Sequence, residues 1–230
     1  MGKAARPLIV LKSNNHFDIV KKEAKALHVG ISLDILSKIA TDIRYGRNIV
    51  DLQLIILELL LGYHTYGTDR YNDEGIQDNR IYVYDAVFII IISIISSKQN
   101  VATILPFDIL LYSTKFYKQF KPRLGIFKSI YVAMMWSTAI IILPSVLHDH
   151  NFDILQEPLD YVPYMFLMIA TSNLMDTKDI EDDKKNKIET IPVKYGTNFS
   201  NKISITSMLA FFVLLFLNLC DKYPNFLSSF

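Results

Sequence analysis

The chain has 230 residues, of which 51% are hydrophobic and 20% charged, with 24 Lys and Arg against 23 Asp and Glu. This near-neutral balance gives no reason to expect the unopposed basic surface that nucleic-acid binding needs, so we expect no nucleic-acid partner. The single cysteine, Cys220, excludes an internal disulfide and a four-cysteine zinc site. The apolar residues are concentrated in long blocks, which favours a helical membrane protein.

The first 46 residues form a polar, basic N-terminal region. Within it, residues 26–43 show helical spacing of Leu and Ile, interrupted by Asp34 and Lys38. This pattern predicts an amphipathic helix or a weak membrane span.

Six apolar runs follow, at residues 48–65, 81–97, 101–117, 126–147, 159–175 and 203–220. A helix needs about 17 to 25 apolar residues to cross a bilayer, which the runs starting at 126 and 203 satisfy and the others satisfy only marginally. Four carboxylates fall within the runs, and we expect them near helix ends or beside a cavity rather than in catalysis: Asp51, Glu58, Asp85 and Asp108.

These runs predict an all-α, polytopic transmembrane helical bundle of six or seven spans at residues 47–220, followed by a tail at 221–230. A soluble protein with unusually apolar helices is the alternative. The uncharged stretch SMLAFFVLLFLNLC at 207–220 argues against it.

The charges of the connecting loops predict a topology. Residues 114–128 and 177–202 are rich in Lys, whereas residues 148–160 carry four acids and neither Lys nor Arg. The positive-inside rule places the first two loops in the cytoplasm and the third on the opposite side. Counting back places residues 66–80 on the cytoplasmic face, and a seventh crossing at 26–43 would bring the basic N-terminal region there too.

Two of these three cytoplasmic loops, residues 66–80 and 177–202, are rich in aspartate. Asp69 and Asp73 are four residues apart, and Asp176, Asp179 and Asp183 would share one face of a continuous helix. Such carboxylates repel one another, so a cation is expected between them. Mg²⁺ suits carboxylate oxygens and completes its shell with phosphates.

Each aspartate cluster alone would indicate only a solvated helix end. Two clusters on one membrane face predict instead a site that holds a diphosphate through Mg²⁺ and stabilises it as it leaves. The apolar interior would accommodate a hydrocarbon tail and keep water from an allylic cation.

The segment SNLMDTKDIEDDKKNKIETIPVKYG resembles the second aspartate-rich motif of the UbiA-type intramembrane prenyltransferases. The matching residues are Asp176, Asp179, Asp183, Lys184, Thr190, Ile191, Pro192, Val193 and Gly196. Asp182 and Lys187 stand where the family usually has glycine.

The first loop matches only half of the family's first motif, through Asp69, Arg70 and Asp73. Thr65 and Tyr66 stand where the leading Asn-Asp would be. An alternative, irregular alignment uses Asn72 and Asp73 followed by Asp78. The resemblance covers roughly residues 47 to 220.

The resemblance implies Mg²⁺-dependent transfer of a prenyl group from a polyprenyl diphosphate to an aromatic or other lipophilic acceptor, within membrane lipid. It implies that the catalytic Asp69, Asp73, Asp179 and Asp183 bind Mg²⁺, supported by Asp176 as a further metal ligand. The substrate-binding residues it implies are Arg70, Asn72, Lys115, Lys118, Lys121, Arg123 and Lys184.

The family ordinarily has nine spans, and this chain lacks room for the last two helices. Either the cavity wall is incomplete, or a partner or second copy of the chain closes it. His64 would either take the acceptor's proton or be an ordinary interfacial residue.

Three other functions fit parts of the pattern. One is a degenerate family member that binds lipid or a partner without catalysis. Another is a small transporter with an acidic vestibule, for which the segment TIPVKYG has no evident use. A soluble isoprenoid synthase would need amphipathic helices with polar outer faces, which these apolar blocks do not provide.

Overall fold

The computed structural model describes residues 16–46, 52–73, 105–149 and 153–224, with four isolated positions between 83 and 90. Some side chains within these ranges, including those of residues 67–73, lie outside the description. The described chain is helical and contains no strand, which confirms the all-α prediction. Its main helices are α1 His16–Tyr45, α2 Leu52–Asp73, α4 Leu105–Leu124, α5 Lys128–Ser137, α6 Leu143–Asp149, α7 Pro158–Lys178, α8 Ile180–Lys185, α9 Ile191–Tyr195 and α10 Thr197–Lys222.

Three short elements connect these helices. A 3₁₀ turn, η2 (Gly125–Phe127), precedes α5, and a second one, η4 (Asp153–Gln156), precedes α7. A π-helical turn, η3 (Thr138–Ile142), joins α5 to α6, so residues 119–149 form one helical stretch with a widened turn inside it.

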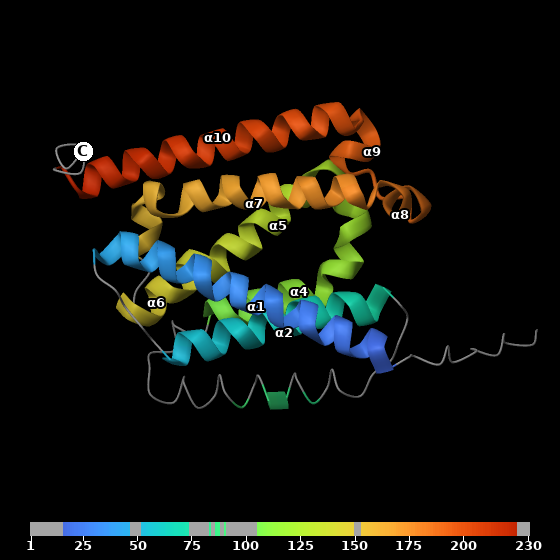
Figure 1. Ribbon diagram of the computed structural model, residues 1–230, viewed down its shortest axis with the longest axis horizontal. Coiled ribbons are helices and arrows are strands. Elements are labelled where there is room, and N and C mark those ends of the chain that lie inside the picture. Colours follow the sequence, from blue (N-terminus) through green and yellow to red (C-terminus); the bar gives the residue numbers. More distant parts are fainter. Residues whose placement is uncertain are drawn as a thin grey trace, which may run out of the picture.

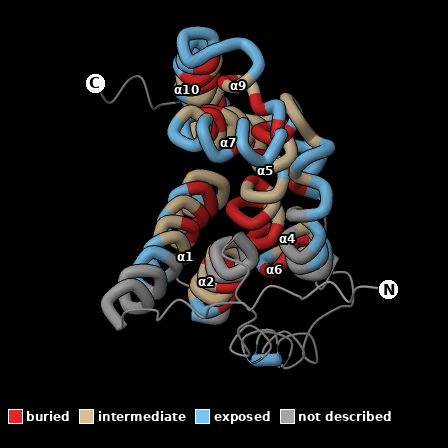
Figure 2. Tube along the Cα trace, turned by 90° about the vertical axis from the view of Figure 1, so that its right-hand side faces the viewer, coloured by how far each residue is buried: buried red, intermediate tan, exposed pale blue. Residues whose placement is uncertain are grey.

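The helices form a bundle in which α7 and α10 run antiparallel, side by side (Figure 1). Helix α5 packs on the other side of α7, while α1 packs on α2 and on η3. Buried positions face the centre of the bundle in the end-on view of Figure 2. The C-terminal end of α2 and the α7–α8 turn lie at the same end of the bundle, on the right in Figure 1.

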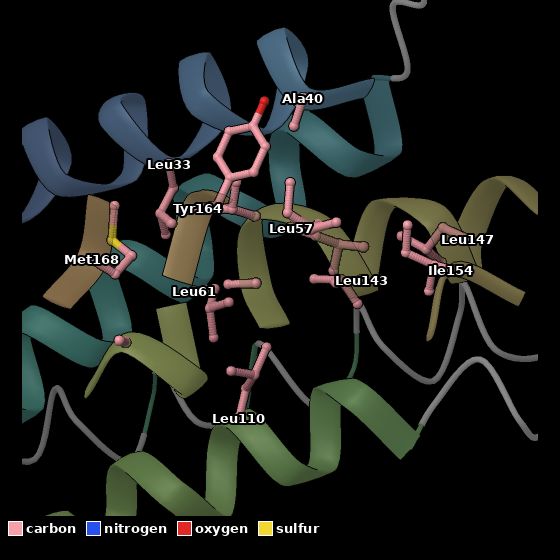
Figure 3. Close-up of a cluster of buried hydrophobic side chains, with 14 residues drawn as sticks. Leu33, Ala40, Leu57, Leu61, Leu110, Leu143, Leu147, Ile154, Tyr164 and Met168 are labelled. Carbon is pink, nitrogen blue, oxygen red and sulfur yellow. The ribbon is translucent and has the colours of Figure 1, made fainter. Parts of the chain in front are cut away.

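The apolar core lies where α1, α2, α7 and the middle of the 119–149 stretch meet. Leu33 of α1, Leu57 and Leu61 of α2 and Tyr164 of α7 project into it (Figure 3). Helices α1 and α2 approach most closely at two glycines. A Cβ added to Gly62 would lie 2.5 Å from the Cα of Gly30, so only a glycine pair permits this crossing.

Helix α10 buries small and polar residues and exposes most of its large apolar ones. Its buried positions are Ser200, Ser204, Ser207 and Asn218. Its exposed large apolar residues are Ile205, Leu209, Phe212, Val213, Phe216 and Leu217. A helix on the surface of a soluble protein has the opposite arrangement, whereas small and polar residues between helices are typical of packing in lipid.

Two helical stretches are long and apolar enough to cross a membrane, Gln119–Asp149 and Thr197–Lys222. They contain the runs 126–147 and 203–220, so the prediction that these two satisfy the length requirement is confirmed. A shorter apolar helix covers Leu54–Tyr66. The described residues do not support six or seven spans, and the run at 81–97 lies outside them apart from isolated positions.

Helix α1 extends well beyond the predicted 26–43. Its inner face includes the buried Leu33, Ser37 and Ala40. An exposed apolar stripe with four-residue spacing runs along another face, formed by Leu27, Ile31, Ile35 and Ile39. The helix is therefore apolar on two sides, which a simple amphipathic helix is not.

Candidate functional site

The second acidic motif folds as two helices with a break between them. Helix α7 ends at Lys178, the backbone of Asp179 leaves the helix at φ −97° and ψ 13°, and α8 starts at Ile180. The prediction of three aspartates on one continuous helical face is therefore wrong. Asp176 and Asp183 are 3% and 2% exposed, whereas Asp179 is exposed to solvent.

A lysine from another helix lies between the two buried aspartates. Lys128 is the first residue of α5 and is itself only 6% exposed. Its Nζ lies 2.5 Å from Oδ1 of Asp176 and 3.5 Å from Oδ2 of Asp183. The hydroxyl of Ser129 donates a 3.4 Å hydrogen bond to the other oxygen of Asp176. This cluster joins α5, α7 and α8.

The charge of Lys128 offsets the desolvation of its partners. Burial raises the pKa of the Asp176 carboxyl, and attraction to the Lys128 ammonium opposes that rise. Removing one partner of a buried ion pair typically costs about 3 to 5 kcal/mol, because the other charge is left without compensation. Lys128 therefore favours the charged form of Asp176 inside the protein.

Helix α8 ends in a Schellman motif. The N–H of Ile188 donates to the carbonyl of Asp183 at 2.8 Å, and the N–H of Lys187 donates to the carbonyl of Lys184 at 3.1 Å. Lys187 adopts a left-handed conformation, with φ of 57°. Glycine is usual at such a position because it has no Cβ, and this is one of the two places where the sequence departs from the family's glycines.

Polar contacts attach the end of α7 to the start of α10. The side-chain N–H groups of Asn173 donate to the carbonyl of Ser200 at 2.7 Å and to the hydroxyl of Ser204 at 3.0 Å. The hydroxyls of Thr177 and Ser200 lie 3.0 Å apart. The two helices that flank the acidic motif are thus fixed to each other.

The other predicted site residues lie elsewhere or outside the description. Lys121 and Arg123 are in the last turn of α4, where Lys121 is half-buried and Arg123 exposed. Lys184 is exposed and pairs with Glu181 at 3.4 Å. Side chains outside the described part are those of Asp69, Arg70, Asn72, Asp73, Lys115 and Lys118.

The carboxylates of the second motif suit Mg²⁺ in chemical type. Across the described ranges, however, no three His, Cys, Asp or Glu side chains converge as a metal-binding group, and Lys128 lies between Asp176 and Asp183. The hydroxyl of Thr190, seven residues after Asp183 in the chain, is buried without a hydrogen-bond partner in the described structure. A metal ion at this motif would therefore take Asp179 and Asp183 and leave Asp176 to Lys128.

A second cluster of charges lies at the opposite end of α7. Arg44 of α1 pairs with Asp149 at 3.4 Å, with Glu157 at 3.1 Å and with Asp160. Lys222 at the end of α10 pairs with Asp160 at 2.6 Å. Two of the four negative charges of the acidic segment 148–160 are thus balanced by cations from distant parts of the chain.

One of the carboxylates within the apolar runs is described. Glu58 is fully buried within α2, and neither of its oxygens has a hydrogen-bond partner in the described structure. His64 is buried on the same helix. The side chains of Asp51, Asp85 and Asp108 lie outside the described part.

Sequence reasoning missed Lys128, Ser129 and Asn173 as members of the site. The sequence analysis counted Lys128 only as one of the positive charges of residues 114–128. Its position close to the start of an apolar run could have indicated that it is buried.

Comparison of the chain with models of protein families, with curated proteins and with solved structures finds no match.

Proposed function

We propose that the chain is an integral-membrane prenyltransferase of the UbiA type. It would transfer a prenyl group from a polyprenyl diphosphate to an aromatic or other lipophilic acceptor, with Mg²⁺ as cofactor. The observation that carries the proposal is the burial of Asp176 and Asp183 at the end of an apolar bundle. Buried carboxylates in a membrane protein are costly, and besides pairing with cations they commonly mark a substrate or ion pathway.

The membrane location is supported by α10, which exposes apolar side chains along most of its length. The proposed architecture has six or seven spans, with both acidic loops on the cytoplasmic face. The ends of α2 and α7 lie at one end of the bundle in Figure 1, which this arrangement requires.

In this proposal the acidic residues bind the metal ion and the basic residues bind the diphosphate. Asp69, Asp73, Asp179 and Asp183 would hold Mg²⁺, which when bound neutralises the charge that develops on the departing diphosphate. Arg70, Asn72 and the four cations of residues 115–123 would bind the diphosphate oxygens, with Lys184 beside them. The apolar core around Leu61 and Met168 would exclude water from the allylic carbon.

The test uses the membrane-embedded protein with labelled farnesyl or geranylgeranyl diphosphate, Mg²⁺ and a panel of acceptors. The wild type should release diphosphate only with Mg²⁺, and Asp179→Ala plus Asp183→Ala should abolish the release. Asp182→Ala is the matched control, because Asp182 is an exposed carboxylate on the same short helix. Release that survives the double substitution would refute the proposal.

A second candidate is a degenerate family member that binds a lipid diphosphate without catalysis. It is favoured by Lys128, which neutralises carboxylates that catalysis would commit to metal. Saturable binding of the diphosphate with no turnover of any acceptor would support this candidate over the enzyme.

A further inference from the structure

Lys128 and its partners form a cluster with unequal contacts. The Lys128 ammonium is 2.5 Å from Asp176 and 3.5 Å from Asp183. Asp176 has a second partner in Ser129, and both belong to helices that pack along their length, α5 and α7. Asp183 belongs to the six-residue α8 and receives only the longer contact from Lys128. Asp176 is thus held firmly, and Asp183 more loosely.

The charges of the cluster do not balance. Two buried carboxylates face one ammonium, which leaves one net negative charge inside the cluster. Lys128 therefore compensates only one of the two buried carboxylates. The remaining negative charge attracts an external cation.

We propose that Lys128 is the resident cation of the second acidic motif and stands in for a divalent ion at Asp176. Asp176 is then a positioning residue, not a metal ligand, and Asp183 is the carboxylate that Lys128 shares with Mg²⁺. This inference rests on the proposed function for the identity of the metal.

The experiment measures stability and metal binding in the full-length protein in lipid nanodiscs, without any diphosphate. Mn²⁺ serves as the probe for Mg²⁺, followed by its paramagnetic resonance signal. Lys128→Met should lower the midpoint of thermal unfolding by roughly 5 °C or more, because two buried carboxylates lose their cation. Mn²⁺ should restore that midpoint and bind about tenfold more tightly than to the wild type.

Two further variants separate electrostatics from packing. Lys128→Met combined with Asp176→Asn removes both charges, so it should recover stability without metal and bind Mn²⁺ with nearly the wild-type affinity. Lys194→Met is the control, because Lys194 is an exposed lysine of α9 whose carboxylate contact is at 4.0 Å. It should leave both measurements unchanged.

The proposal is overturned if Lys128→Met keeps the wild-type midpoint, or if Mn²⁺ fails to restore a lowered one. If the Lys128→Met protein cannot be produced in folded form, the variant that combines Lys128→Met with Asp176→Asn tests the proposal instead. Folded protein from this double variant supports the proposal, and failure to obtain it refutes the proposal. The experiment does not measure prenyl transfer, so its outcome is independent of the test of the proposed function. A protein without transferase activity can still show the expected stability and Mn²⁺ binding, and an active enzyme can fail to show them.

Discussion

Replacing Lys187 with glycine should stabilise the protein. Lys187 has a φ of 57° at the position after the C-cap of α8, where the Schellman hydrogen bonds from Lys187 and Ile188 require a left-handed residue. For a residue with a Cβ this conformation costs roughly 1 to 2 kcal/mol. Glycine avoids that cost but is more flexible in the unfolded chain, so the net gain should be about 1 kcal/mol.

Thermal unfolding in a fixed detergent should show the gain as a rise of about 2 to 4 °C. Two variants make the measurement specific. Lys187→Ala removes the long side chain but keeps the Cβ, so it should bring no gain. Lys185→Gly, in the last turn of α8, should lose about 1 kcal/mol. If Lys187→Gly is no more stable than Lys187→Ala, the left-handed turn is not present.

The α1–α2 crossing and the Arg44 cluster give two more predictions. Gly62→Ala should lower the free energy of chemical unfolding by about 1 to 3 kcal/mol, because the added Cβ would meet the backbone of Gly30. Ile56→Ala, on the exposed side of α2, should lower it clearly less. Equal losses would contradict the close crossing. Burial and a hydrogen bond to Asp149 raise the pKa of Tyr45 to about 12, above its ordinary value near 10. Tyr45 therefore contributes about 1 to 2 kcal/mol of folding stability that is complete below about pH 10 and is lost as the pH rises to 12. Tyr45→Phe should remove this part of the loss of stability at high pH. Parallel curves of unfolding free energy against pH for the two proteins would contradict the prediction.

The parts of the fold that sequence predicts are those determined locally. The absence of charge between residues 207 and 220 is enough to predict a long apolar helix. The break at Asp179 was missed because carboxylates at helical spacing indicate a continuous helix, whereas the chain leaves the helix at Asp179 and Asp183 is buried beyond it.

The parts that sequence does not predict depend on contacts between distant residues. Lys128 meets partners that lie 48 and 55 positions later in the chain. The charge count over 148–160 could not include Arg44 or Lys222, which pair with three of its four carboxylates in the folded protein. The departure at Lys187 was visible in the sequence, but only the backbone angle gives its physical meaning.

The polar contacts between α7 and α10 have a consequence for how these helices can move. Asn218 donates to the carbonyl of Leu159 at 2.9 Å and to Asp160 at 3.1 Å, while Asn173 bonds Ser200 about 20 Å farther along α7. In lipid, apolar contacts alone let two helices slide or rotate with little penalty. Two directional attachments at opposite ends fix both the register and the rotation of the pair. The end of α7 and the start of α10 flank the segment that carries Asp179 and Asp183. The polar contacts therefore hold the two ends of this segment at a constant separation.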